Sequence, residues 1–331
     1  LTVTHRGARV VDLSMHFLHK GIPQRVLEAV WTGDGGLEMG DGAQNPKPQF
    51  PSPNPREALL RLLAHPNIAS KEPIVRTYDH EVRGGTVVKP LVGAAADGPG
   101  DAAVLQPLRT SLEGLALGSG INPRYGLIDP YWMALACVDE ALRNVVAVGG
   151  DPRRTAILDN FCWGDPTRPE TLGSLLEAAR GCHDAALFYG TPFISGKDSL
   201  NNEYLGADGK RHAIPPTLLI SAIGLIDDVR SAVTSDLKAA GHHLFLIGET
   251  RAEMAGAHVW KVVGGAREEG GESEAVPGPV EGAPALYQAL HDAIAQGLVA
   301  SCHDLSEGGL AVAAAEMCIG GRLGLALTLP D

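Results

Sequence analysis

The clearest helical pattern of apolar and polar residues covers residues 129–148, DPYWMALACVDEALRNVVAV. Asp129 suits the N-cap, Pro130 suits the first helical position, and the two glycines at 149 and 150 are expected to end the helix. Similar patterns predict further helices over residues 56–64, 172–189, 285–296 and 310–318.

Short apolar runs between these helices predict the strands of a sheet. Residues 155–160 form an apolar strand, and residues 218–225 form a buried one. Residues 74–93 are interpreted as a strand, a polar turn and a second strand. Further strands are expected over residues 102–105, 112–117, 243–247 and 323–329. This mixture predicts an α+β fold, similar to an α/β sandwich.

The same patterns divide the chain into four parts. Residues 1–32 are interpreted as the tail of a preceding domain, and residues 33–71 as a proline- and glycine-rich linker with one short helix. In that helix Asn54 is a plausible cap ahead of Pro55. Residues 72–232 and 233–331 are expected to form two further domains, the second incomplete. The chain is therefore expected to begin and end inside domains.

Composition narrows the function classes without identifying one. The chain has 331 residues, 44% of them hydrophobic and 20% charged, which is ordinary for a soluble globular protein. The net charge of −12 argues against a nucleic acid or an anionic membrane as partner, but local basic groups can still bind phosphate. The five cysteines are scattered and form no CxxC pair, so we expect reduced thiols in a cytoplasmic protein. No signal peptide and no membrane-spanning apolar stretch are present.

The polar stretch TPFISGKDSLNNEY, residues 191–204, is the first candidate for chemistry. Its SGKDS segment, residues 195–199, is expected to be a loop after a strand, and it combines small residues with one cation and one carboxylate. Exposed backbone N–H groups with such charges suit a phosphate and its metal ion. The two-glycine frame of a P-loop is absent, and an ordinary polar turn explains the segment equally well.

Carboxylates and amides beside glycine loops or at strand ends form a second set of candidates. Asp101 follows a glycine loop, Glu140 and Asn144 project from one helix face, Asp159 ends a strand, and Asp304 opens a helix. Such oxygens are ligands for Mg²⁺, with substrate phosphates completing the octahedron. Each has a simpler explanation as well, since Asp304 can be only a helix cap and Glu140 only a surface residue.

Three other charged residues are interpreted more simply. Asp139 and Arg143 are four apart on the same helix and are expected to form a solvent-exposed salt pair. His303, next to Asp304, could be a general base, but a histidine at a helix start is more often a cap. No nucleophile–base pair of convincing spacing is present, so the catalytic residues stay unknown.

Seven runs of the chain resemble the phosphoribosylformylglycinamidine synthases. They are YDHEVRGGTVVKPL, GPGDAAVL, GINPRYGLIDPYWMA, DEALRNVVAVGGDP, LDNFCWGDP, TPFISGKDSLNNEY and SCHDLSEGGLAVAAAEM. The resemblance implies the paired domains of the aminoimidazole ribonucleotide synthetase superfamily, repeated twice. This chain resembles the end of the first repeat, the linker, the N-terminal ATP-binding-type domain of the second repeat and part of its C-terminal domain.

The resemblance also implies roles for individual residues. In the large form of the enzyme, positions matching Asp101, Glu140, Asn144 and Asp304 hold Mg²⁺, and the position of Ser306 contacts nucleotide. In the small form, positions matching Asp159 and Gly196 contact ATP, and that of Ser199 contacts formylglycinamide ribonucleotide. Lys197 stands where the small form has asparagine. Because an ammonium cannot ligate Mg²⁺, Lys197 is expected to pair with phosphate, with Asp198 as the alternative metal ligand.

The implied reaction uses ATP to phosphorylate the amide oxygen of formylglycinamide ribonucleotide. Ammonia from a glutaminase domain or subunit then displaces phosphate from the iminophosphate and gives formylglycinamidine ribonucleotide. The family's catalytic histidines lie in the first repeat, so this chain alone is expected to be inactive without the remaining half of the synthetase. The alternatives are a non-catalytic half that binds ADP and Mg²⁺ as an assembly module, or a sister enzyme such as selenophosphate synthetase.

Two spatial expectations follow for a structure. Glu140 and Asn144 should face Asp101 and form one metal–phosphate site with Asp304. Asp159 and Ser199 follow apolar strand segments, so both should emerge at one sheet edge and face one pocket.

Overall fold

The computed structural model describes residues 1–21, 24–31, 33, 54–81, 83–251, 253–263 and 275–328. Most of the expected linker and residues 264–274 of the glycine- and glutamate-rich segment lie outside the described residues. The division into four domains stays a prediction. None of the described helices combines the length and the apolar character that crossing a membrane requires.

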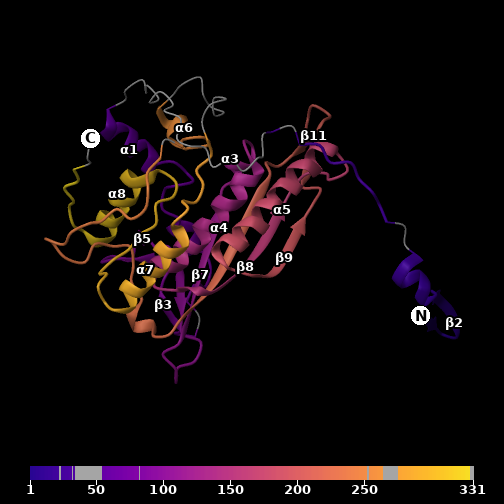
Figure 1. The fold of residues 1–331 in the computed structure, drawn as a ribbon, viewed down its shortest axis with the longest axis horizontal. Helices are drawn as coiled ribbons and strands as arrows, with labels where there is room; N and C mark the ends of the chain where they lie inside the picture. The colour runs from indigo at the N-terminus through magenta and orange to yellow at the C-terminus, as the bar shows by residue number, and fades with distance from the viewer. Residues whose placement is uncertain are drawn as a thin grey trace.

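A six-stranded sheet forms the centre of the structure, with the strand order β3-β6-β7-β12-β8-β9 (Figure 1). All neighbouring strands are antiparallel except β8 and β9, which are parallel. The strands are β3 (Thr86–Val88), β6 (Ala103–Leu105), β7 (Gly114–Ile121), β12 (Thr217–Ile226), β8 (Asp151–Cys162) and β9 (Phe193–Ser199). The fold is thus α+β, as predicted.

Two helices, α4 (Pro130–Ala147) and α5 (Pro169–Tyr189), lie side by side over one face of this sheet (Figure 1). The N-terminus of α4 is as predicted, because the Asp129 carboxylate accepts a hydrogen bond from the Trp132 N–H at 3.1 Å. Buried residues of α4 such as Met133 and Val138 join Ile157 and Ile220 of the sheet in one core. This core fixes the position of α4, which carries several candidate site residues.

The opposite face of the sheet carries apolar side chains that the described residues leave partly open. Along β12, buried residues alternate with half-buried ones, and Leu219 and Ile223 belong to the half-buried set. They pair with Ile121 and Leu117 of β7, which are 43% and 38% exposed. Because paired residues share a face, these four side chains form one apolar surface, which we call the open sheet face.

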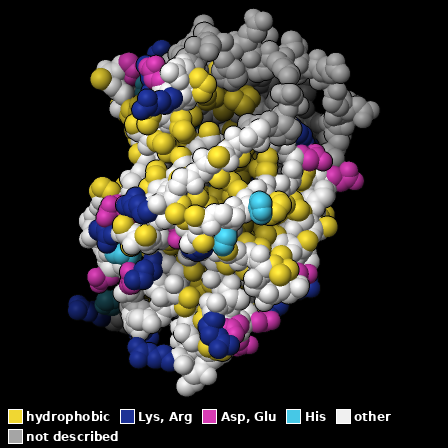
Figure 2. All heavy atoms as spheres, turned by 90° about the vertical axis from the view of Figure 1, so that its left-hand side faces the viewer, with side chains coloured by type: hydrophobic (Ala, Val, Ile, Leu, Met, Phe, Trp, Pro, Cys, Tyr) yellow, Lys and Arg dark blue, Asp and Glu magenta, His cyan; other side chains and the backbone are white. Residues whose placement is uncertain are grey.

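The C-terminal part of the chain packs beside this unit. Helix α7 (Ala283–Ala295) contacts β8 and α4, and α8 (Gly309–Gly321) contacts β5 (Gly98–Pro99) and α1 (Pro55–Leu63). Apolar side chains gather across the middle of the side of the molecule on which α7 and α8 lie (Figure 2). The contacts of α7 and α8 bring the C-terminal residues next to α4 and the start of β6.

Smaller elements complete the structure. They are the hairpin β1 (Thr2–His5)–β2 (Ala8–Asp12), η1 (Phe17–Gly21), α2 (Glu72–Val75), β4 (Leu91–Val92) paired with β5, α3 (Pro123–Gly126), the pair β10 (Glu203–Leu205)–β11 (Arg211–Ala213), η2 (Val229–Ser231) and α6 (Val259–Val263). The β1–β2 hairpin lies away from the sheet (Figure 1). The cap of α1 is as predicted, with the Asn54 side chain accepting from the Arg56 N–H.

Four predicted elements are wrong. Residues 74–75 belong to the short helix α2, which has a proline in its first turn, and not to a strand. The SGKDS segment is not a loop, because it continues β9 to Ser199. Residues 243–247 and 323–328 form no strand in the described structure, and Phe245 is 78% exposed. An apolar run becomes a strand only where a partner strand can take its backbone hydrogen bonds.

Candidate metal and phosphate site

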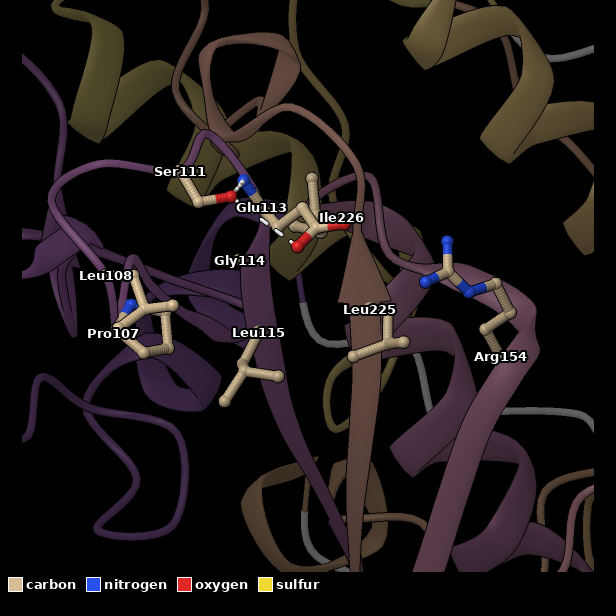
Figure 3. Close-up of a pocket in the computed structure, with 9 residues that line it drawn as sticks. All are labelled: Pro107, Leu108, Ser111, Glu113, Gly114, Leu115, Arg154, Leu225 and Ile226. Atoms are coloured by element: carbon tan, nitrogen blue, oxygen red, sulfur yellow. Dashed lines mark hydrogen bonds between the residues drawn. The ribbon is translucent and has the colours of Figure 1, made fainter.

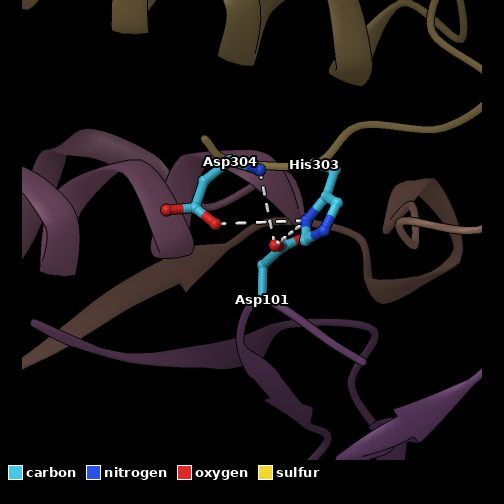
Figure 4. Close-up of side chains that lie close together, drawn as sticks. All are labelled: Asp101, His303 and Asp304. Carbon is cyan, nitrogen blue, oxygen red and sulfur yellow. Dashed lines mark hydrogen bonds and ion pairs between the residues drawn. The ribbon is translucent and has the colours of Figure 1, made fainter. Parts of the chain in front are cut away.

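Three segments that are distant in sequence meet at a cluster of charged side chains. Asp101 lies just before β6, His303 and Asp304 lie in the loop before α8, and helix α4 passes beside them. One potential ligand atom from each of Asp101, His303 and Asp304 lies within 4.8 Å of the other two (Figure 4). We call these three residues the acidic cluster. The structure therefore brings together Asp101 and Asp304, two of the four predicted metal ligands.

His303 is held between two carboxylates. Its Nδ1 lies 2.5 Å from Asp101 Oδ1, and its Nε2 lies 3.0 Å from Glu316 Oε2. Burial opposes a charge on the ring, but the hydrogen bonds to Asp101 and Glu316 outweigh it and raise the pKa of His303 to about 10. Since both nitrogens donate, the ring has no free lone pair to act as a base. His303 does not cap α8 either, because Gly308 occupies the N-cap.

Two carboxylate oxygens of the cluster are buried without a hydrogen-bond donor, Asp101 Oδ2 and Asp304 Oδ2. Leaving such an atom unpaired costs about 1–3 kcal/mol. Burial and the nearby Asp101 raise the pKa of Asp304 to about 6, although Arg143 and His303 act against this. The cluster is therefore short of positive charge, and its hard oxygen donors fit a divalent cation such as Mg²⁺.

Glu140 and Asn144 lie on α4 and are both bonded to the end of β7. Glu140 Oε2 accepts from the Ile121 N–H at 2.9 Å, and Asn144 Nδ2 donates to the Ser119 carbonyl at 2.8 Å. Burial, with repulsion from Asp304, raises the pKa of Glu140 to about 7 even though Arg143 opposes the shift. The charge of Asp304 therefore acts on Glu140, but Glu140 is not one of the three residues of the acidic cluster. The four-residue metal site stays a prediction.

The predicted solvent-exposed pair of Asp139 and Arg143 is wrong, because the pair is largely buried. Asp139 is 5% exposed and accepts hydrogen bonds from Arg143, from the Tyr189 hydroxyl and, at 2.5 Å, from the Tyr287 hydroxyl. Tyr287 belongs to α7, which packs on this side of α4. The helical spacing identified the ion pair, but the covering helix comes from a distant part of the sequence.

Two basic side chains not predicted from the sequence act on the charge of Glu307, the residue after Ser306. Burial raises the pKa of Glu307, and the charges of Lys71 and Arg124 oppose that rise. His258 Nδ1 lies 3.6 Å from a Glu307 carboxylate oxygen. The only sequence signal was the position of Arg124 inside the GINPRYG run. The contact of Ser306 with nucleotide stays a prediction.

Asp159 and Gly196 are neighbours on the parallel strands β8 and β9. A Cβ atom at Gly196 would lie 2.7 Å from the Asp159 carboxylate, so glycine gives this side chain its space. Burial raises the pKa of Asp159, the Lys197 N–H opposes the rise by donating to the carboxylate, and Asp198 adds to it. The proximity agrees with a shared role, which stays a prediction.

The expected common pocket of Asp159 and Ser199 is wrong. Ser199 pairs with Cys162, three residues beyond Asp159, and successive side chains alternate between the two faces of a strand. The two side chains therefore lie on opposite faces of the sheet. Lys197 shares the face of Ser199 and donates to its hydroxyl.

A cavity of about 190 Å³ lies where β7 begins and β12 ends (Figure 3). Its lining is mostly apolar and includes Leu108, Leu115 and Leu225, with Glu113 and Arg154 as the charged members. No residue of the acidic cluster and none of the predicted ligands lines it. The cavity is therefore separate from the candidate site.

Comparisons with known proteins match the two parts of the chain. The family model "AIR synthase related protein, N-terminal domain" matches residues 99–226, and "AIR synthase related protein, C-terminal domain" matches residues 239–331. Asp101 falls in the first match and Asp304 in the second.

Curated relatives are named phosphoribosylformylglycinamidine synthase subunit PurL. The protein from Deinococcus radiodurans is 40% identical over 99% of this chain and 42% of its own length. The protein from Methanothrix thermoacetophila is 34% identical over 99% of this chain and 40% of its own length. A structure described as T. maritima PurL complexed with ADP has a TM-score of 0.49 and 24% identity, and covers 72% of this chain and 33% of that one. The chain thus spans about two fifths of the length of these curated relatives.

Proposed function

The chain belongs to the AIR synthase-related family, and we propose that it forms the nucleotide-binding part of an ATP-dependent phosphoribosylformylglycinamidine synthase. In the proposed reaction ATP activates the amide oxygen of formylglycinamide ribonucleotide, and ammonia replaces the resulting phosphate. Five free cysteines suit the reducing cytoplasm, where we place the protein.

The proposal rests on the proximity of Asp101 and Asp304 in the structure. The two residues are 203 positions apart, in the two separate family matches, yet the Asp304 N–H lies 3.4 Å from Asp101 Oδ1. Both carboxylates keep a buried oxygen without a donor. A bound cation would satisfy both oxygens and join the two parts of the chain at one point.

Mg²⁺ would be held by Asp101 and Asp304, with Glu140 and Asn144 as the further ligands. When bound, it would neutralise charge on the phosphates of the nucleotide. His303 orients Asp101 through its short hydrogen bond, so that the second carboxylate oxygen stays free. Ser306 would contact the nucleotide.

A second nucleotide contact is proposed at the β8–β9 edge. There Asp159 and Gly196 would contact ATP, and Lys197, which lies with Ser199 on the opposite face, would pair with a phosphate group on that face. Ser199, on the other face, would contact formylglycinamide ribonucleotide.

The remaining half of the synthetase is the proposed partner, and the open sheet face is its proposed contact surface. Leu117 and Ile121 expose apolar surface there. A contiguous exposed apolar surface of this kind is typical of a protein interface. A glutaminase domain or subunit would supply the ammonia. No nucleic acid or membrane partner is proposed.

Replacing Leu117 by aspartate tests this contact surface. We expect association with the separately expressed remaining half to weaken at least tenfold, because the charge would be buried unpaired. The free energy of unfolding of the isolated variant should stay within about 0.5 kcal/mol of the wild-type value, as for other exposed positions. The matched control is Leu187→Asp on α5, which is 71% exposed and outside the open sheet face. Equal association of both variants would contradict the contact surface.

Calorimetric titration of the 331-residue chain with ATP and Mg²⁺ tests the metal site. We expect Asp304→Asn to weaken binding by about a hundredfold or more, since even outer partners of a metal ligand contribute roughly 10–100-fold. EDTA should have the same effect on the wild type. Asp208→Asn removes an exposed carboxylate of a surface ion pair and should change nothing. ATP binding that survives both EDTA and Asp304→Asn would contradict the proposal.

A non-catalytic role as an ADP- and Mg²⁺-binding module is the second candidate, because His303 has both nitrogens engaged and offers no base. Turnover separates the two functions when the remaining half, ammonia, ATP and substrate are supplied. If the site is catalytic, Asp304→Asn abolishes product formation even when the halves are fully associated. If it is an assembly module, the variant loses association while the associated fraction keeps its activity.

A further inference from the structure

Arg143 places a permanent positive charge next to the acidic cluster. Its Nη1 donates to Asp139, while its Nη2 lies 3.6 Å from Asp304 Oδ2, too far for a hydrogen bond. Its Nε is buried and has no hydrogen-bond partner. The guanidinium therefore stands between two carboxylates, bonded to one and only near the other.

The position of the guanidinium is set by Asp139. That carboxylate is fixed by the hydroxyls of Tyr189 from α5 and Tyr287 from α7, whose rings are stacked with centroids 5.9 Å apart. Arg143 lies one helical turn after Asp139 on α4, so its side chain reaches Asp139 directly. Asp139 thus accepts hydrogen bonds from Arg143 and from both tyrosines. Its hydrogen bond with Arg143 keeps the guanidinium from full contact with Asp304.

We propose that Arg143 is a built-in cation that makes the acidic cluster a weak site for a free divalent metal and a better site for a metal already carrying a phosphate. This inference rests on the proposed metal site. Arg143 offsets part of the charge of Asp304, so a bare cation gains less there. A nucleotide phosphate brings its own negative charge, which the positive charge of Arg143 attracts. Arg143 acts through Asp304 and is a positioning residue, with Asp139 controlling its reach.

The test measures binding of Mn²⁺ alone to the full 331-residue chain, by the electron paramagnetic resonance signal of the free ion. We expect Arg143→Met to bind Mn²⁺ about tenfold more tightly than wild type, within the range found for outer partners of metal ligands. Asp139→Asn releases Arg143 towards Asp304 and should weaken Mn²⁺ binding several-fold. Arg143→Lys keeps the charge and should stay close to wild type. If Arg143 had a purely structural role, all three variants would bind Mn²⁺ more weakly than the wild type.

Matched controls come from the exposed pair of Arg154 and Asp227, whose side chains are 44% and 82% exposed. Arg154→Met and Asp227→Asn change the net charge in the same way as the two main variants, and both should leave Mn²⁺ binding unchanged. If Arg143→Met does not fold, the weaker binding of Asp139→Asn beside an unchanged Asp227→Asn still supports the proposal, and equal binding of those two overturns it.

A second titration adds ADP together with Mn²⁺. In the wild type, ADP should increase Mn²⁺ affinity, and Arg143→Met should lose most of that increase. Equal or weaker Mn²⁺ binding by Arg143→Met, or an unchanged effect of ADP, overturns the inference. If Arg143→Met binds free Mn²⁺ and the wild type does not, the proposed role of Arg143 is supported. The wild-type site then holds no metal in the absence of nucleotide. If neither protein binds Mn²⁺ with or without ADP, both the metal site and the inference fail.

Discussion

Replacing Gly120 by alanine is expected to destabilise the chain by about 3 kcal/mol, the upper end of the usual cost of overpacking a core. Gly120 lies on β7 directly under α4. A Cβ atom at this position would lie 2.0 Å from the Cys137 carbonyl oxygen and 2.9 Å from the Ala141 backbone nitrogen. Both are backbone atoms of α4, so no side-chain rotation can relieve the contact, and the whole helix has to move.

Denaturant unfolding measures this effect, with Gly282→Ala as the matched control. Gly282 has ordinary backbone angles, and nothing lies within 4 Å of a Cβ atom built there. We expect the control to unfold at the wild-type denaturant concentration. Since α4 carries Glu140, Arg143 and Asn144, Gly120→Ala should also weaken metal and nucleotide binding. If Gly120→Ala lowers the free energy of unfolding by less than about 1 kcal/mol, α4 does not lie this close to β7.

The sequence predicted the elements of the central unit because local rules decide them. The α4 helix has a capping aspartate and a proline at its first turn, and β12 is a mostly apolar run. The strands predicted over residues 243–247 and 323–328 are wrong, because an apolar run indicates only a preference for burial, while a strand also needs a partner strand. The SGKDS segment failed in the opposite way. Its polar residues suit an edge strand that pairs with β8 on one side only.

The candidate site was predictable in its residue types but not in its geometry. Glycine loops and helix starts indicated Asp101 and Asp304, and the structure places them side by side. The partners of His303 and Asp139 are Glu316, Tyr189 and Tyr287, which lie 13 to 148 residues away. No local pattern connects residues at such separations, so the burial of Arg143 could not be predicted. The opposite faces of Asp159 and Ser199 depend on strand register, which tertiary pairing decides.

His258 is expected to make the chain sensitive to acid. It is 3% exposed, and its Nε2 lies 2.8 Å from the Asn67 amide nitrogen, which donates to it. The ring is therefore neutral, with Nε2 as the acceptor. Burial, followed by the charges of His65, Arg124 and Lys261, lowers the pKa of His258 from 6.5 to about 4. The folded chain therefore resists protonation of this ring over more than two pH units.

The sign of the effect follows from linkage. Between pH 6.5 and about 4 the unfolded chain takes up a proton on His258 and the folded chain does not, so acid favours unfolding. The contribution to stability is complete above pH 6.5 and falls by about 3 kcal/mol by pH 4. We expect His258→Gln to lose less stability than wild type over this window, measured by denaturant unfolding at several pH values. His243→Gln, at an exposed histidine, should follow the wild-type curve. Parallel curves for wild type and His258→Gln would show that the buried ring is protonated in the folded chain as readily as in the unfolded one.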